Sequence, residues 1–326
     1  MQTKEDMPRV VFMGTPEFAV APLSAIFSAG IPIVSVVTVP DRPAGRGLKM
    51  RPSAVKKYAL EVGIPVLQPE SLEDEEFLTT LRGLHADMGV VVAFRKLPPV
   101  VYQIPRLGSF NLHASLLPNY RGAAPINWVL INGERETGVT TFLLNDEIDR
   151  GAILMQDPVP LQDNTTFGEL YDILSLFGSR LVYRTIKRLW SGELQPTAQP
   201  AGDGAPVAPK IYRNTRRIDF HAPAEKIHNL VRGLSPCPCA WCEMAVDGKP
   251  PQEVKIFYTS LQAAGAEDSV GAAVGTSRPT PDGKSLCVRC GDGHILMIHE
   301  LQPAGRKPML VGDFLRGNRG ADIVFS

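Results

Sequence analysis

Short, strongly apolar runs that alternate with amphipathic segments constrain the fold of this chain more than any other feature. The runs at 10–14, 33–39 and 88–94 are rich in valine and contain no charged side chain. Strands that are covered on both faces of a parallel sheet have this continuous apolar character. Segments with helical spacing, such as 72–84, separate the runs, so the sequence predicts an α/β domain with a largely parallel sheet.

Three local signals predict details of the helices. Thr15 is placed to cap a helix that has Pro16 at its first position. Thr166 and Glu169 have the spacing of a capping box, which predicts that a long helix opens there. Gly178 lies inside that helix and is a candidate for a kink.

The second half of the chain has a different organisation. A length of 326 residues allows two domains or one large one. Prolines and glycines concentrate in 194–209, a composition that is typical of a linker. The segment after it alternates short strand candidates with turn sequences and predicts a small, mainly β domain. We therefore expect domains at 1–193 and 210–326.

Asn111 and His113 are the first candidate catalytic residues. They are two positions apart in the β-prone run 107–113, so their side chains share one face of the predicted strand. An amide and an imidazole on one face can polarise a carbonyl group and shuttle a proton. The alternative is a structural histidine at a strand end, beside an asparagine in a turn.

A carboxylate after the next predicted strand can complete this group. Asp149 follows the β-prone run 139–144 and lies close to the turn-forming Gly151, so it is the preferred partner for His113. Asp146 and Glu147 are its competitors, and both can equally be ordinary loop charges.

The segment 41–51 combines four cationic side chains with proline and glycine and has little apolar material. Such a loop is either a solvated surface segment or a contact for phosphate groups. The whole chain carries 34 basic and 34 acidic side chains, so its net charge does not decide between these alternatives.

Composition limits the cellular context and the metal chemistry. The N-terminal residues have no apolar signal-peptide core, and no apolar run approaches the roughly 18 residues that span a bilayer. We expect a soluble cytoplasmic protein with no membrane association. Cys239, Cys242, Cys287 and Cys290 form two C-x-x-C pairs, which are either buried free thiols or a structural zinc site.

The run His113–Pro118, followed by Arg121–Ile126, resembles the signature of the 10-formyltetrahydrofolate-dependent formyltransferases. Three more segments, Gly14–Ala19, Asp41–Gly47 and Leu301–Gly305, are similar to the branch of that family that acts on methionyl-tRNA. The resemblance covers nearly the whole chain. It implies a Rossmann-like formyltransferase domain followed by a smaller, OB-like β-barrel domain that binds tRNA.

The resemblance also implies roles for individual residues. Asn111, His113 and Asp149 are expected to be catalytic, with 10-formyltetrahydrofolate as the formyl donor and no metal. Two segments depart from the family pattern: 94–98 has Arg95 where a glycine is expected, and 149–152 reads Asp-Arg-Gly-Ala. The residues expected to bind the folate are Phe94, Arg95, Leu97, Ser115, Leu116, Leu117 and Pro118.

The implied macromolecular partner is methionyl initiator tRNA, and the protein is expected to be a monomer. The residues expected to contact the tRNA are Arg42, Arg46, Lys49, Arg51 and Lys210. Two alternatives use the same residues differently. One is a formyltransferase for an amino sugar-nucleotide or another small amine, and the other is a non-catalytic RNA-binding protein.

Overall fold

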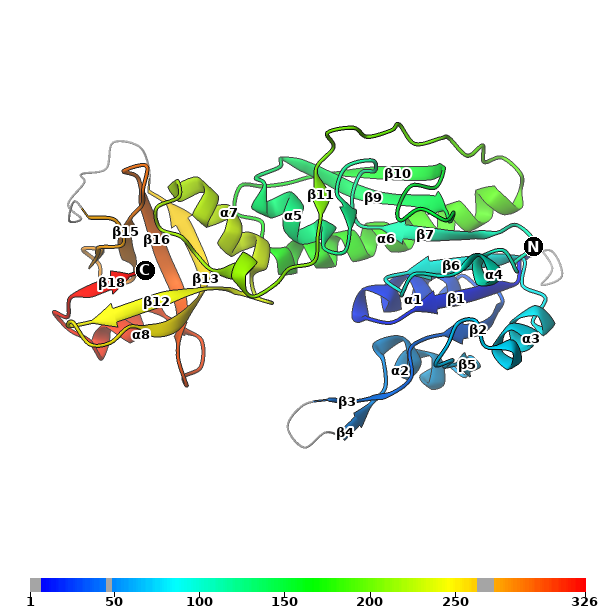
Figure 1. Ribbon diagram of the computed structural model, residues 1–326, viewed down its shortest axis with the longest axis horizontal. Coiled ribbons are helices and arrows are strands. Elements are labelled where there is room, and N and C mark those ends of the chain that lie inside the picture. The colour runs from blue at the N-terminus through cyan, green and yellow to red at the C-terminus, as the bar shows by residue number, and fades with distance from the viewer. Residues whose placement is uncertain (1–6, 45–48, 263–272) are drawn as a thin grey trace. The chain divides into compact units, whose positions relative to one another are not determined.

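The computed structural model describes residues 7–44, 49–262 and 273–326, with the side chains of Ala44 and Lys49 left out (Figure 1). The chain forms two compact units, which are described separately below. Unit 1 runs to Gly122 and continues through Glu136–Pro160 and Tyr171–Val207, and unit 2 contains Ala123–Arg135, Leu161–Leu170 and Ala208–Ser326. The two units therefore interleave in sequence, and the domain limits 1–193 and 210–326 stay a prediction.

Unit 1 is built on a seven-stranded sheet with the order β10-β9-β7-β6-β1-β2-β5. Its strands are β1 (Val10–Gly14), β2 (Ile33–Val37), β5 (Val66–Leu67), β6 (Met88–Val92), β7 (Ser109–His113), β9 (Glu136–Leu143) and β10 (Ile153–Pro160). Pairs from β7 to β5 are parallel, whereas β9 and β10 are antiparallel. Every residue of β1 and β6 is buried, which confirms the prediction of a largely parallel, two-sided sheet.

The helices of unit 1 connect these strands. They are η2 (Glu17–Ala19), α1 (Val20–Ser28), α2 (Ala54–Glu61), α3 (Glu75–Gly83), α4 (Pro99–Tyr102) and, in large part, α6 (Phe167–Trp190). The predicted cap at Thr15 is wrong. The helix opens as a 3₁₀ turn after an extended Pro16, no side chain caps it, and the buried Thr15 hydroxyl has no partner among the described residues.

The other two helix signals lie in α6. The capping box is confirmed, because the Thr166 N–H donates to Glu169 Oε2 at 2.8 Å and the Glu169 N–H donates to Thr166 Oγ1 at 3.3 Å. Figure 1 shows α6 lying along β7, β9 and β10. The helix is continuous through Gly178, where a Cβ atom would lie 2.7 Å from Cδ2 of Leu112 on β7. This glycine therefore permits close approach of helix and strand.

The order of the parallel strands places a topological switch point between β1 and β6. From β1 the chain moves outward to β2 and β5, and it then returns to form β6 on the other side of β1. Connections on the two sides diverge at such a switch point, where α/β sheets bind their ligands. The segments 15–19 and 93–98 leave the sheet at this edge.

Unit 2 is a nearly closed antiparallel β-barrel. Its strands pair in the order β14-β15-β16-β13-β12-β18, and an isolated bridge from Thr276 to Val324 connects the two ends. α7 packs on the barrel core through the buried side chains of Ile227, Val231 and Leu234. The strands are β12 (Ala240–Val246), β13 (Gln252–Leu261), β14 (Ser277–Pro279), β15 (Leu286–Arg289), β16 (Ile295–Pro303), β17 (Met309–Leu310) and β18 (Ile323–Phe325), and the helices are α5 (Pro125–Ile131), η3 (Asn214–Arg216), α7 (Ala224–Leu234) and α8 (Val311–Arg316).

Four short strands lie outside the main sheets. β3 (Arg42–Ala44) and β4 (Lys49–Arg51) form an antiparallel ribbon, and β8 (Arg121–Gly122) and β11 (Val207–Ala208) are two residues each. Among the described residues, none of the helices has the length and hydropathy needed to cross a membrane.

Candidate active site

Asn111 and His113 project from the same face of β7. In the parallel ladder Asn111 lies beside Val91 of β6, so both side chains lie on the same face of the sheet. Val91 packs in a cluster with Leu97 and Leu144, which follow β6 and β9. The segments after these two strands therefore cover the sheet face that carries the polar pair.

His113 as a whole residue is 6% exposed, and its imidazole ring is held at one nitrogen. Its Nε2 atom lies 2.9 Å from the backbone carbonyl oxygen of Tyr120. A carbonyl oxygen only accepts hydrogen bonds, so Nε2 carries a proton in this arrangement. The other nitrogen, Nδ1, faces Oδ2 of Asp149 at 3.9 Å. This distance exceeds a direct hydrogen bond and allows a third group to reach Nδ1.

Asp149 reaches His113 by a different route from the predicted one. β9 is antiparallel to β7, with Leu143 opposite Phe110, so β9 ends beside the start of β7 and not beside His113. The loop 144–152 then folds back along the sheet. At Gly151 a Cβ atom would lie 1.6 Å from the carbonyl oxygen of Leu143, so this path requires glycine.

The two competing carboxylates point to other partners. Asp146 accepts a hydrogen bond from the Tyr102 hydroxyl at 2.8 Å. Burial and this contact raise the pKa of Tyr102. Glu147 is exposed and lies 3.5 Å from Arg150. Of the three candidate acids, the structure therefore brings only Asp149 next to His113.

The loop 115–118 is anchored by Thr140, which lies opposite His113 on β9. The Thr140 hydroxyl donates to the Ser115 carbonyl at 2.6 Å and accepts from the Leu117 N–H at 3.2 Å and from Gln156 Nε2 at 2.9 Å. Ser115 and Leu117 are buried, whereas Leu116 and Pro118 are partly exposed. The roles of these four residues in folate binding stay a prediction.

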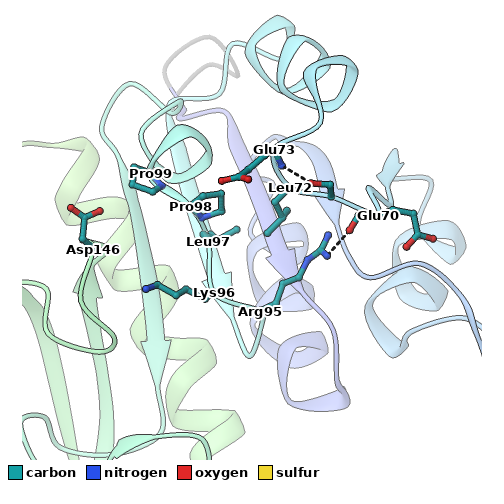
Figure 2. Close-up of a pocket in the computed structure, with 10 residues that line it drawn as sticks. Glu70, Leu72, Glu73, Arg95, Lys96, Leu97, Pro98, Pro99 and Asp146 are labelled. Carbon is teal, nitrogen blue, oxygen red and sulfur yellow. Dashed lines mark hydrogen bonds between the residues drawn. The ribbon is translucent and has the colours of Figure 1, made fainter.

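A cavity of about 580 Å³ is lined by the segments that follow β5 and β6 and by the loop after β9 (Figure 2). Two of the predicted folate-binding residues, Arg95 and Leu97, line it, and Phe94 packs in the apolar cluster with Leu97. Figure 2 shows Asp146 on a separate loop, across the cavity from Lys96 and Pro99. The complete lining is Glu70, Ser71, Leu72, Glu73, Arg95, Lys96, Leu97, Pro98, Pro99 and Asp146.

Arg95 replaces the expected glycine and is integrated into the wall of this cavity. Its guanidinium donates to the carbonyl oxygens of Pro69 at 2.6 Å and Glu70 at 2.9 Å. Burial lowers the pKa of Arg95, and its Nε atom has no partner among the described residues.

The predicted tRNA contacts are divided between the two units. Arg42 and Arg51 lie opposite each other in the β3–β4 ribbon and are exposed. Like charges in this arrangement repel, which an anion would relieve. Arg46 lies outside the described residues, and only the backbone of Lys49 is described. Lys210 belongs to unit 2, where its Nζ atom lies 5.8 Å from the ring centre of Tyr212.

The cysteine pairs are buried thiols in the structure. Cys239, Cys242, Cys287 and Cys290 are buried, and Cys237 is exposed. Desolvation raises the pKa of Cys239 and of Cys290 to about 12. The described part of the chain contains no group of three or more potential ligands that could hold a metal ion.

Family models match both parts of the chain. The formyl transferase model matches residues 8–186, and the model of the formyl transferase C-terminal domain matches residues 210–319. Curated relatives match over nearly the full length. A methionyl-tRNA formyltransferase from Parabacteroides distasonis is 47% identical and covers 96% of both chains, and one from Bacteroides thetaiotaomicron is 45% identical and covers 98% of both.

Solved structures show the same fold at low sequence identity. WlaRD, a sugar 3N-formyl transferase, superimposes with a TM-score of 0.65 at 18% identity and covers 92% of this chain and 99% of its own. An N-formyltransferase from Helicobacter canadensis gives a TM-score of 0.62 at 20% identity, with 91% and 100% covered.

Proposed function

The chain belongs to the formyl transferase family, and from this we propose that it moves the formyl group of 10-formyltetrahydrofolate to the α-amine of methionyl initiator tRNA. The observation that carries the proposal is similarity at 42–47% identity, over almost the whole length, to relatives named methionyl-tRNA formyltransferase. An enzyme for an amino sugar-nucleotide is the second candidate. Its structural relatives are only 18–20% identical, which supports a shared fold and not a shared acceptor.

In the proposed reaction the amine attacks the formyl carbon and an oxyanion develops. The side chain of Asn111 makes no hydrogen bond to another described residue, so its amide is free to donate to that oxygen. Protonated His113 is the second donor. Its Nε2–H stays on the Tyr120 carbonyl, so the Nδ1–H is the one directed to the reacting group.

Asp149 faces the same ring nitrogen of His113. Its Oδ2 atom lies 3.9 Å from Nδ1, so the carboxylate lies beside the atom that exchanges the proton. The amine must lose a proton while the bond from the formyl carbon to the folate nitrogen breaks, and that nitrogen gains a proton. The Nδ1–H of protonated His113 goes to that nitrogen, and Nδ1 of the neutral ring then takes the proton that the amine loses, because Nδ1 is the ring nitrogen with room for a third group.

The folate is expected to occupy the cavity lined by residues 95–99 and Asp146. Its lining combines the apolar Leu97 with two cations, Arg95 and Lys96, and with the acids Glu70, Glu73 and Asp146. A flat heterocycle that carries several donors and acceptors suits this combination of apolar lining and polar groups.

Two basic surfaces are proposed to bind tRNA. The first is the β3–β4 ribbon with Arg42 and Arg51. The second lies on unit 2, near Lys210, where the guanidinium of Arg213 lies 4.4 Å from the ring centre of Trp241. Cationic side chains bind phosphates, and aromatic rings beside them can stack on unpaired bases.

The test is formyl transfer from labelled 10-formyltetrahydrofolate to charged initiator tRNA, with charged elongator tRNA, free methionine and an amino sugar-nucleotide as parallel acceptors. Transfer to methionyl initiator tRNA alone supports the proposal. Transfer to the amino sugar-nucleotide alone would replace it with the second candidate. Folate binding without transfer to any acceptor would contradict both.

A further inference from the structure

The segment that follows α6 in unit 1 runs back across the loops of the candidate site. We call residues 197–206 the strap. Its first residue pairs with β10 through two backbone hydrogen bonds between Thr197 and Ile153, at 2.7 and 2.9 Å. Near its end, the carbonyl of Pro206 accepts from the Tyr120 N–H at 2.6 Å. Tyr120 is the residue whose own carbonyl holds His113.

Gln199 is partly buried, whereas its neighbours in the strap, Ala198 and Pro200, are exposed. Its side-chain amide donates to the backbone carbonyls of Asp149 at 2.9 Å and Gly151 at 2.7 Å. Its oxygen accepts from Nη2 of Arg121 at 2.7 Å. Both amide hydrogens and the amide oxygen of Gln199 are therefore used, all on the loops around the site.

Arg121 reaches the same backbone group from the other side. Its Nε atom donates to the carbonyl of Asp149 at 3.1 Å, so that oxygen accepts from both Arg121 and Gln199. The next residue, Gly122, donates its N–H to Oδ2 of the Asp149 side chain at 2.9 Å. Backbone and side chain of Asp149 are thus fixed by two consecutive residues and the strap.

The backbone of Asp149 needs this support. Its φ angle is 55°, in the left-handed region, which costs an L-residue about 1 kcal/mol or more. Such a conformation persists where surrounding contacts hold it, and these positions concentrate at functional sites. Without the two donors on its carbonyl, the loop can relax to a conformation that withdraws the carboxylate from His113.

We propose that Gln199, with Arg121, is a positioning residue that holds the Asp149 carboxylate against His113 through the strap. Neither side chain hydrogen-bonds to His113, so both act through Asp149. The inference rests on the proposed function, because it assigns Asp149 a part in the same reaction.

The variants Gln199→Leu and Gln199→Glu test this inference. Leucine removes the two donors, and glutamate keeps the shape but replaces the donor group by a second oxygen that faces two carbonyls. Each is expected to lower kcat by about 10- to 100-fold, because a small displacement of a reacting group has this effect. The KM for tRNA is expected to change less than threefold. The control is Gln195→Leu, an exposed glutamine before the strap, which should leave kcat unchanged.

A second experiment distinguishes positioning from general stability. In an Asp149→Ala background, Gln199→Leu should cause no further loss of kcat, because the group that it positions is gone. An additive loss in that background, or an unchanged kcat in Gln199→Leu alone, would overturn the inference.

The third readout does not depend on activity. Hydrogen exchange of the Gly122 amide, which donates to Asp149, should become faster in Gln199→Leu and stay unchanged in Gln195→Leu. If the wild-type protein formylates no tRNA, the proposed function fails, and this exchange measurement still tests the inference. Unchanged Gly122 protection in Gln199→Leu would contradict it.

Discussion

Oδ2 of Asp149, the oxygen that faces His113, also accepts a hydrogen bond from the backbone N–H of Gly122 at 2.9 Å. The carboxylate is therefore placed by the backbone of the loop after β7 and not by the imidazole. Since Tyr120 of the same loop holds the other side of His113, one short segment sets both components of the pair.

Replacement of His113 by alanine should lower turnover by about 10²- to 10⁴-fold, the usual contribution of a general acid–base group. This corresponds to about 3–5 kcal/mol of transition-state stabilisation. The measurement is kcat for formyl transfer, with His294→Ala, an exposed histidine of unit 2, as the control. Near-normal turnover in His113→Ala would remove this residue from the mechanism.

Replacement of Arg42 by alanine should raise the KM for tRNA and leave the KM for folate nearly unchanged. Arg42 and Arg51 repel each other across the ribbon, so the pair gains most when a phosphate lies between them. A higher salt concentration should also raise the KM for tRNA, because phosphate contacts release counterions. Arg82→Ala, on the exposed surface of α3, removes the same charge elsewhere and should not change the KM for tRNA. An equal rise in this KM in both variants would favour the alternative that the ribbon is a solvated surface segment.

Two buried threonines of β9 should respond in opposite ways to replacement by valine. Thr140→Val leaves the Leu117 N–H without its acceptor and the Ser115 carbonyl without its donor, and it should destabilise the fold by about 2–4 kcal/mol. The Thr137 hydroxyl is buried and makes no hydrogen bond within the described residues, so Thr137→Val should be neutral or stabilising. Urea unfolding of the two variants measures the difference. Equal losses of stability in the two variants would show that hydrogen bonding does not decide how β9 responds to these replacements.

Gly178→Ala should destabilise unit 1 by about 1–3 kcal/mol, because the new methyl group meets the side chain of Leu112. Leu112→Val shortens that side chain and should recover part of the loss. A double-mutant cycle on the free energy of unfolding is expected to give a favourable coupling of at least about 0.5 kcal/mol. Strict additivity would show that the helix and strand move apart instead.

The cysteines should differ sharply in reactivity with a thiol reagent at pH 8. Cys237 is exposed and should react in the native protein, whereas the four buried thiols should react only after unfolding. The raised pKa values also affect stability. An unfolded thiol loses its proton near pH 9, whereas folded Cys239 and Cys290 keep theirs until about pH 12. The free energy of unfolding should therefore fall as pH rises through that window. More than one fast-reacting thiol in the native state would contradict the packing.

Much of the architecture could be predicted from local sequence patterns. The apolar runs at 10–14 and 88–94 predicted fully buried parallel strands, and the spacing of Thr166 and Glu169 predicted the start of α6. A two-residue spacing placed Asn111 and His113 on one strand face. These features depend on the period of a strand or on contacts within one helical turn, so they can be recognised in a single segment.

The remaining features depend on residues far apart in the chain. Asp149 reaches His113 only because β9 runs antiparallel to β7 and its loop folds back over a glycine. Gln199 lies in a segment that by composition is a linker, and its amide contacts residues about 50 positions away. The sequence by itself thus determined the buried strands, the start of α6 and the polar pair, because short-range periodicity and capping encode them. Strand direction and loop closure decided which acid meets the histidine, because those contacts form only when distant segments pack together.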